Sequence, residues 1–391
     1  MKTLVLNCGS SSIKYRLYDG ETLLADGLAE RIGESSGRLT YHGKGEAVEQ
    51  TGPIQDHQSG MERVLQLLTH PKTGVLANKE DLTQIGHRVV HGGEAFQQPA
   101  LITQAVLQAI KDCIPLAPLH NPANITGIEV ATQVFPGAKQ IAVFDTAFHQ
   151  TLPEKAYRYA LPEAHYQELR VRRYGFHGTS HKFVALEAAK VLGKPIEDLK
   201  LITLHLGNGS SMAAIAGGRS IDTTMGLTPL EGLVMGTRCG DLDPAIPGFL
   251  AEHLNLSLQQ VDQLLNKNSG FKGLTGHNDL RTIVAKFEAG GEKEKLALEL
   301  AAYRIKKYIG AYTAALGGLD ALIFTAGIGE HSSLFRSLCV EGLEFLGLGL
   351  DLTKNQAPLH PDLSLTGSKA KILVIPTNEE LMIVRECRSL A

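Results

Sequence analysis

The sequence lacks the features that would place it in a specialised class of protein. It contains no tryptophan, only 20% of its residues are charged, and 38 lysines and arginines against 41 acidic residues leave a net charge of −3. This balance provides no broad basic surface for nucleic acid or for an anionic membrane, and the composition is that of a folded globular protein. We therefore predict no nucleic-acid partner and no membrane partner, so any anion site has to be local.

Cysteine is scarce and scattered. The five cysteines are Cys8, Cys113, Cys239, Cys339 and Cys387. Their odd number and the absence of any C-x-x-C spacing argue against a disulfide framework or a zinc site and favour a reducing compartment. No apolar run reaches the roughly 18 residues that span a bilayer, and the N-terminal apolar stretch is too short for a signal peptide. These observations predict a cytoplasmic location.

A pattern near the N-terminus occurs again two hundred residues later. Residues 4–18, LVLNCGSSSIKYRLY, are typical of a strand, a Gly-Ser-Ser turn and a return strand. Residues 204–216, LHLGNGSSMAAIA, place leucine, glycine and serine at the same offsets. The chain is long enough for two domains of about 150 to 200 residues, so the repeat indicates two related half-molecules. Chance agreement between two ordinary hairpins is the alternative.

Helix-like and strand-like segments alternate along the chain. Apolar periodicity and end signals predict helices at 60–68, 103–113, 124–135, 180–193, 292–316, 333–346 and 381–390, and strands at 85–94, 139–149, 199–206, 321–331 and 371–380. This alternation predicts an α/β fold. We place a crossover at 150–180, which divides the chain into domains 1–149 and 150–380, with 381–391 as a helix that could return to the first domain.

Four strands end abruptly in polar or glycine-rich residues: VLN-CGSSS, HRVV-HGGE, AVF-DTAFH and IFT-AGIGEH. Ligands bind at this end of the strands in open α/β sheets, although ordinary loops are the alternative for each segment. Glycine lets backbone N–H groups approach phosphate oxygens, and serine adds uncharged donors, so two Gly-Ser turns predict a polyphosphate site. The chain has no P-loop, no three-glycine dinucleotide fingerprint and no protein-kinase signature.

Several charged residues lie in small, glycine-containing contexts that suit a transferring phosphoryl group. Arg88, Arg238 and the segment 170–182 supply guanidinium groups, which bind phosphoryl oxygens in pairs. A solvent-exposed run is the alternative for the arginines at 170, 172 and 173. Asp145 and Glu379 follow strands and suit Mg²⁺ held through water, with a helix cap or a surface carboxylate as the alternative.

His177 and His181 have the i, i+4 spacing of two metal ligands on a helix. Gly175 and Gly178 argue against a helix at that point. We therefore expect His177 to donate to a phosphoryl oxygen, with a packed histidine as the alternative.

These segments together resemble the acetate kinase family. VLNCGSSSIKY, HRVVHGGE, FDTAFH, RRYGFHGTSH, HLGNGSS, MGLTPLEGLVMGTRCGDLDP, FTAGIGEH and IPTNEE occur in the family's order between residues 4 and 380. The resemblance implies an α/β fold of the sugar kinase, actin and Hsp70 superfamily, with two duplicated ribonuclease-H-like domains around a nucleotide cleft. It also implies reversible in-line transfer of the ATP γ-phosphoryl group to acetate, with Mg²⁺ or Mn²⁺ as the metal. A homodimer formed through the second domain, which also binds ATP or ADP, is implied as well.

The resemblance assigns roles to individual residues. The catalytic set is Asp145, His177, Arg238 and Arg88, and the metal set is Asn7 and Glu379. Substrate-binding residues are Arg88, Val90, Leu119, Phe176 and Pro229. Nucleotide and phosphate contacts fall on Ser10, Ser12, Lys14, His205, Leu206, Gly207, Asn208, Gly209, Asp279, Leu280, Arg281, Gly327, Ile328, Gly329, Glu330 and His331. Cys239 stands where serine is more usual.

Elementary chemistry agrees with a set of cationic and amide donors. A carboxylic acid with a pKa of about 4 is already ionised at neutral pH, so no general base is required. The obstacle is repulsion between two anions, which arginine and a divalent cation relieve; this argues against proton abstraction by Asp145.

A propionate kinase of the same family remains the alternative for a short-chain carboxylate substrate. A nucleotide-switched binding protein, chaperone-like or filament-forming, is an alternative of a different class.

Overall fold

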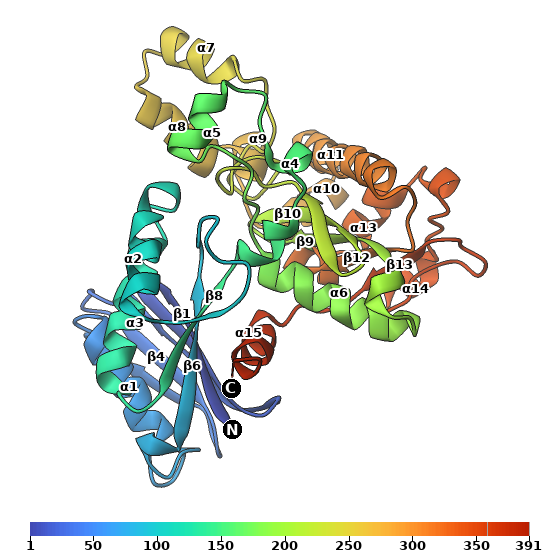
Figure 1. Cartoon of the computed structure of the whole chain (residues 1–391). Helices are drawn as coiled ribbons and strands as arrows, with labels where there is room; N and C mark the ends of the chain where they lie inside the picture. Colours follow the sequence, from blue (N-terminus) through green and yellow to red (C-terminus); the bar gives the residue numbers. More distant parts are fainter. Residues whose placement is uncertain (358, 391) are drawn as a thin grey trace. The chain divides into compact units, whose positions relative to one another are not determined.

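The computed structural model describes residues 1–357 and 359–390, which form two compact units (Figure 1). Unit 1 comprises Met1–Gln150 and Asn378–Ala391, and unit 2 comprises Thr151–Thr377. The sequence placed the two boundaries after residues 149 and 380. The roles assigned to the two domains stay predictions.

Unit 1 is built on an eight-stranded sheet with the order β5-β4-β3-β2-β1-β6-β8-β7. Its strands are β1 (Lys2–Gly9), β2 (Ser12–Asp19), β3 (Thr22–Glu30), β4 (Arg38–His42), β5 (Val48–Thr51), β6 (Leu82–Val89), β7 (Ala100–Leu101) and β8 (Lys139–Phe144). Its helices are α1 (His57–Leu68), α2 (Gln104–Asp112), α3 (Asn121–Val134) and α15 (Glu379–Arg388). Helices α1 and α3 pack against each other and cover a core that includes Leu4, Ile13 and Val64.

Unit 2 is built on a five-stranded sheet with the order β11-β10-β9-β12-β13. Its strands are β9 (Lys200–Leu206), β10 (Ser210–Ala216), β11 (Arg219–Thr223), β12 (Ala321–Thr325) and β13 (Lys371–Val374). Its helices are α4 (Glu154–Tyr157), α5 (Glu163–Leu169), α6 (Gly178–Leu192), α7 (Ile246–His253), α8 (Leu258–Lys267), α9 (Gly270–Thr275), α10 (Leu280–Glu288), α11 (Glu292–Leu316), α12 (Ala326–His331), α13 (Ser333–Val340) and α14 (Leu352–Gln356). None of the helices in the described part of the chain has the length and apolar character needed to cross a membrane.

The two sheets contain the same five-stranded pattern. In β3-β2-β1-β6-β8 and in β11-β10-β9-β12-β13, three antiparallel strands are followed by two strands that run parallel to the third. Both serine-containing segments form the hairpins that the sequence predicted, one between β1 and β2 and the other between β9 and β10. The prediction of two related half-molecules is therefore confirmed.

Two helices follow, in the sequence, a strand of the unit to which they do not belong. Each then packs on the sheet of its own unit. Helix α6 comes after β8 of unit 1 but packs on β9 and β12 of unit 2, whereas α15 comes after β13 and packs on β1, β6 and β8 of unit 1. The contact of α15 is close: a methyl group on Gly86 would lie 2.5 Å from Ile383 Cγ2 and 2.7 Å from Cys387 Sγ. Only glycine at position 86 lets this helix approach β6 so closely.

Local signals explain where several elements begin and end. Thr103 caps α2 by accepting a hydrogen bond from the amide of Val106, and Gly193 ends α6 with a φ of 63°, as the sequence predicted. The long helix α11 has the predicted bounds. Helix α13 ends at Val340, earlier than predicted, because Gly342 turns the chain with a φ of 77°.

Three sequence predictions need correction. A helix does begin beside His177, because His177 itself adopts a left-handed φ of 57° as the N-cap and Gly178 is the first helical residue. The segment AGIGEH is not an open glycine loop but the short helix α12, in which Gly327 and Gly329 are helical. The last strand ends at Val374, and Glu379 is the first residue of α15 rather than the end of a strand.

Candidate active site

In unit 1, Arg88 on β6 forms an ion pair with Asp145, which directly follows β8. The strands are parallel neighbours, so their carboxyl ends place both side chains at one edge of the sheet. Asp145 is buried, so it is not the surface carboxylate that the sequence left open as an alternative. Burial lowers the pKa of Arg88, but the carboxylates of Asp145 and Glu379 more than offset this and hold the pKa above its ordinary value.

The first turn of α15 brings two carboxylates to this edge. Glu380 pairs with Lys14 at 2.5 Å and with Arg16 at 3.1 Å. Glu379 has no hydrogen bond or ion pair with any described residue, and burial, opposed by Arg88 but reinforced by Asp145, raises its pKa. A carboxylate with no protein partner fits a hydrated divalent cation. The described chain has no cluster of three or more metal-binding side chains, so such an ion would be held mainly by water and substrate oxygens.

The other residues predicted in unit 1 have contrasting positions. Asn7 lies on β1 opposite Lys14 on β2, and Ser10 is exposed at the tip of their hairpin, two residues before Ser12. Val90 is buried, whereas the Leu119 side chain is 69% exposed. The apolar substrate pocket stays a prediction, because its other two members, Phe176 and Pro229, belong to unit 2.

In unit 2, His177 and Arg238 both approach Gly209 in the β9–β10 turn. A methyl group built on Gly209 would lie 3.5 Å from Nη1 of Arg238 and 3.6 Å from Nε2 of His177. Arg238 donates to the carbonyl oxygen of Pro229 at 3.1 Å, has no carboxylate partner in the described chain, and has its pKa lowered by burial. A desolvated guanidinium without a counterion favours an anionic ligand at this point.

The loop that carries Arg238 is fixed at both ends. Glu231 pairs with Arg173 at 2.5 Å, and Asp241 accepts a hydrogen bond from Tyr308 at 2.7 Å and pairs with Arg304 at 3.3 Å. Arg173 also donates to three successive carbonyl oxygens, those of residues 223–225. The sequence left open whether the arginines at 170, 172 and 173 form a solvent-exposed run. Arg170 is exposed, whereas Arg172 is buried and Arg173 binds backbone carbonyl oxygens.

The serine hydroxyls of the second hairpin make hydrogen bonds within unit 2. Ser210 donates to the carbonyl oxygen of Gly207 at 3.0 Å, and Ser211 lies between His177 and His181. At this hairpin the residues that face a cavity are Gly207 and Asn208. The phosphate-binding role of this hairpin stays a prediction.

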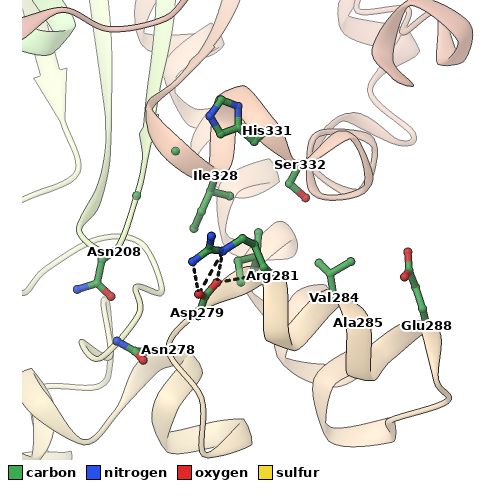
Figure 2. Close-up of a pocket in the computed structure, with 13 residues that line it drawn as sticks. Asn208, Asn278, Asp279, Arg281, Val284, Ala285, Glu288, Ile328, His331 and Ser332 are labelled. Carbon is green, nitrogen blue, oxygen red and sulfur yellow. Dashed lines mark hydrogen bonds and ion pairs between the residues drawn. The ribbon is translucent and has the colours of Figure 1, made fainter. Parts of the chain in front are cut away.

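A cavity of about 710 Å³ in unit 2 contains many of the predicted nucleotide contacts (Figure 2). Its size is within the range of about 300 to 1,000 Å³ typical of small-molecule sites. It is lined by Gly207, Asn208, Asn278, Asp279, Leu280, Arg281, Val284, Ala285, Glu288, Gly327, Ile328, His331 and Ser332. Figure 2 shows Asn208 and Asn278 at one side and Glu288 at the other. The Arg281 guanidinium lies 2.6 Å from Asp279 and holds the pKa of that carboxyl below its usual value.

Five lining residues were missed by the sequence reasoning: Asn278, Val284, Ala285, Glu288 and Ser332. Residues 281, 284, 285 and 288 share one face of α10, so helical periodicity from Arg281 could have found them. Five of the contacts predicted in unit 2 do not line the cavity: His205, Leu206, Gly209, Gly329 and Glu330. Leu206 lies in the core, and Glu330 instead accepts a hydrogen bond from the amide of Thr377 at 3.1 Å.

Helix α12 is held in place by Arg336, a buried residue that no sequence signal marked. Its Nη1 donates to the carbonyl oxygens of Gly329 and Glu330, both at 2.9 Å, and its Nε donates to Asn355 at 2.7 Å. Burial lowers the pKa of Arg336 to about 10. Because α12 supplies part of the cavity wall, Arg336 fixes the shape of that wall.

Comparison with known proteins places this geometry in a family. The model of the acetokinase family matches residues 2–385. The chain belongs to the acetokinase family. The acetate kinase of Halothermothrix orenii is 53% identical over 391 residues, covering 99% of this chain and 98% of that protein. The resemblance seen in the sequence is therefore confirmed.

Solved structures of similar proteins agree with the acetokinase assignment. The Porphyromonas gingivalis acetate kinase has a TM-score of 0.95 at 43% identity, covering 100% of this chain and 99% of that chain. A propionate kinase from Francisella tularensis has a TM-score of 0.93 at 41% identity, with 98% of each chain covered. The fold is the duplicated actin/Hsp70-like α/β architecture of these enzymes.

Proposed function

We propose that this acetokinase transfers the γ-phosphoryl group of ATP to acetate and forms acetyl phosphate and ADP, reversibly and by direct in-line attack. The observation that carries the proposal is the full-length match, at 53% identity, to a protein named acetate kinase. The cavity of unit 2 and the Arg238 guanidinium, which has no carboxylate partner among the described residues, support it, because both suit a polyanionic nucleotide.

The proposed roles need no proton abstraction. Acetate is ionised at neutral pH, and Arg88 and Arg238 would hold its carboxylate and the moving phosphoryl group. His177 would donate a hydrogen bond to a phosphoryl oxygen as charge develops. Asp145 is a positioning residue in this scheme, because both of its oxygens accept hydrogen bonds from Arg88.

ATP or ADP would occupy the cavity of unit 2, with its phosphates toward Asn208 and Gly209. Asn7 and Glu379 would hold Mg²⁺, or Mn²⁺, through water. The ion, when bound, neutralises charge on the phosphates and so lowers the repulsion of the incoming carboxylate. Ser10, Ser12 and Lys14 would contact phosphate, which requires Lys14 to exchange its ion pair with Glu380 for the substrate.

The test is hydroxylamine trapping of the acyl phosphate with ATP, Mg²⁺ and acetate, propionate or butyrate. We expect acetyl hydroxamate to form with the highest kcat/KM, and failure to form hydroxamate from any of the three acids would overturn the proposal. The likeness to the Francisella enzyme makes propionate kinase the second candidate, and a higher kcat/KM with propionate would establish it. Since one methylene is worth only about 1–3 kcal/mol, the two substrates should overlap. ATP hydrolysis without carboxylate dependence would instead indicate a nucleotide-switched binding protein.

The proposal includes a homodimer formed through unit 2, in the cytoplasm. Leu296, Leu300 and Tyr303 form an exposed stripe on one face of α11, with exposed fractions of 58%, 37% and 65%. Glu292 and Lys307 lie at opposite ends of the same face, so two copies related by a two-fold axis could pair them. Light scattering should give the mass of a dimer for the native chain and that of a monomer for Leu296→Asp/Tyr303→Asp.

A further inference from the structure

Four polar side chains of unit 2 form a hydrogen-bonded row that ends at His177. Oγ1 of Thr203 lies 2.7 Å from Nδ1 of His181, and Nε2 of His181 lies 2.8 Å from Oγ of Ser211. The same oxygen of Ser211 lies 2.9 Å from Nδ1 of His177. Thr203 on β9, His181 on α6 and Ser211 on β10 are all fully buried. The row therefore joins three elements of the unit to one candidate catalytic side chain.

When both rings are neutral, only two orders let the buried Ser211 hydroxyl donate one hydrogen bond and accept the other. If Ser211 accepted from both rings, its own hydrogen would be buried without an acceptor, which is costly. In the first, Thr203 donates to Nδ1 of His181, Nε2–H of His181 donates to Ser211, and Ser211 donates to Nδ1 of His177. In the second, every one of these hydrogen bonds is reversed. The two orders place the proton of His177 on different nitrogens, Nε2 in the first and Nδ1 in the second.

Thr203 decides between the two orders. Its hydroxyl has His181 as its one hydrogen-bond partner in the described chain. In the second order the hydroxyl would accept from His181, and its own hydrogen would be buried without an acceptor. A buried hydroxyl donor without a partner is costly, so the first order is favoured.

We propose that Thr203, His181 and Ser211 are positioning residues that hold His177 as the Nε2–H tautomer, so that this N–H donates to the phosphoryl group. The proposal rests on the proposed function, and it adds the device that selects the donor. Nε2 of His177 and Nη1 of Arg238 face the same space beside Gly209. An Nδ1–H tautomer would present a lone pair to a phosphoryl oxygen there, which repels instead of stabilising it.

The surroundings of His177 favour a neutral donor. Its ring stacks on that of His205 with centroids 4.1 Å apart, and Nδ1 of His205 lies 2.8 Å from Oγ of Ser180. Arg238 is a permanent cation on the other side of Gly209. An imidazolium at position 177 would face this cation and a second imidazole, so a neutral N–H supplies the hydrogen bond without added positive charge.

The direct test is a two-bond ¹H–¹⁵N correlation spectrum of the resting full-length protein at neutral pH, with His177→Asn and His181→Gln used to assign the signals. We expect both His177 and His181 to be neutral with the proton on Nε2. A proton on Nδ1 of either ring, or an imidazolium at position 177, would overturn the proposal. This measurement needs no turnover, so its result is separate from the hydroxamate assay that judges the proposed function.

Two variants of matched shape test the effect on catalysis. His181→Gln can still donate to Ser211 and should keep the native order, with kcat lowered less than about tenfold. His181→Glu can only accept, so Ser211 must accept from Nδ1–H of His177, and kcat should fall by about 10²-fold, the usual effect of losing one donor to the transition state. KM for ATP and for acetate should change less than about twofold in both variants. A folded His181→Glu protein with native kcat would overturn the proposal.

Thr203→Asp reverses the row from its other end if His181→Glu does not fold. A carboxylate at position 203 requires Nδ1–H on His181, whereas the Thr203→Asn amide can still donate. We expect Nδ1–H at His177 and loss of kcat in Thr203→Asp, with both features restored in Thr203→Asn. Equal kcat in the two folded variants would count against the row as the selector of the tautomer.

Discussion

Asp145 accepts hydrogen bonds from Arg88 through both carboxylate oxygens, with Nη2 of Arg88 2.5 Å from Oδ2 and Nε 3.2 Å from Oδ1. This fork fixes the direction of the guanidinium, because two parallel hydrogen bonds leave it little rotational freedom. The remaining donors of Arg88 are then presented in a defined direction. Both oxygens of the Asp145 carboxylate bind the guanidinium, which favours a positioning role over a proton-transfer role.

Asp145→Asn should therefore impair acetate binding rather than proton transfer. One charge-assisted hydrogen bond is worth about 1.5–3 kcal/mol, so we expect the KM for acetate to rise by about tenfold or more. The shape of the kcat profile between pH 6 and 9 should stay native. Asp26→Asn, which removes an exposed partner of His42, is the control and should leave the KM unchanged. A native KM for acetate in Asp145→Asn would show that Arg88 does not depend on this pair.

The sequence allowed the strand ends that carry Arg88 and Asp145 to be predicted, because apolar runs that stop at polar residues are a local signal. Other features depend on tertiary contacts and could not be predicted. The start of α6 requires a left-handed φ at His177, which is rare outside glycine. The inward orientation of Ser211 depends on His181, which is 30 residues away in the sequence. Arg336 looks like any helical arginine until its partners are known.

Gly209→Ala should block catalysis without disturbing the fold. The added methyl group would meet Arg238 and His177 at ordinary contact distances, 3.5 and 3.6 Å, so neither has to move. It would nevertheless occupy the space where the phosphoryl group is proposed to pass. We expect kcat to fall by about 10²-fold or more while the melting temperature stays within about 2 °C of native.

The control for this variant is Gly137→Ala, where an added methyl group has no neighbour within 4 Å. It should leave both kcat and melting temperature native. If Gly209→Ala retained native turnover, the space between Arg238 and His177 could not be the phosphoryl site.

Gly327→Val should weaken nucleotide binding alone. A Cβ atom added at this position of α12 meets no atom outside its own helix turn within 4 Å, so a side chain there has room to project from the cavity wall. Steric overlap with a ligand typically costs about 1–3 kcal/mol, so the dissociation constant for ADP, measured by calorimetry, should rise by about tenfold or more. The KM for acetate should remain native. Unchanged ADP affinity would place the nucleotide outside this cavity.

Glu379→Gln should raise the stability of the protein at alkaline pH and lower its activity. Burial, together with the carboxylates of Asp145 and Glu380, raises the pKa of Glu379 above the ordinary value of about 4.3 despite the opposing effect of Arg88. In the interval between the ordinary and the raised pKa, the folded state binds a proton that the unfolded state has lost. Stability therefore falls as the pH rises through this interval, and above the raised pKa the folded protein carries the full cost of the ionised group.

Glutamine removes that cost, so in EDTA the Glu379→Gln protein should melt above the native protein at pH 8, and this advantage should shrink at pH 5. Its Mg²⁺-dependent kcat should fall by about 10²-fold or more, because the amide is a poor ligand for the hydrated ion. Scanning fluorimetry at both pH values and hydroxamate formation provide the two measurements. If the variant melted above the native protein by the same amount at both pH values, the raised pKa of Glu379 could not be the source of the added stability. If the variant kept the native kcat, Glu379 would not belong to the metal site.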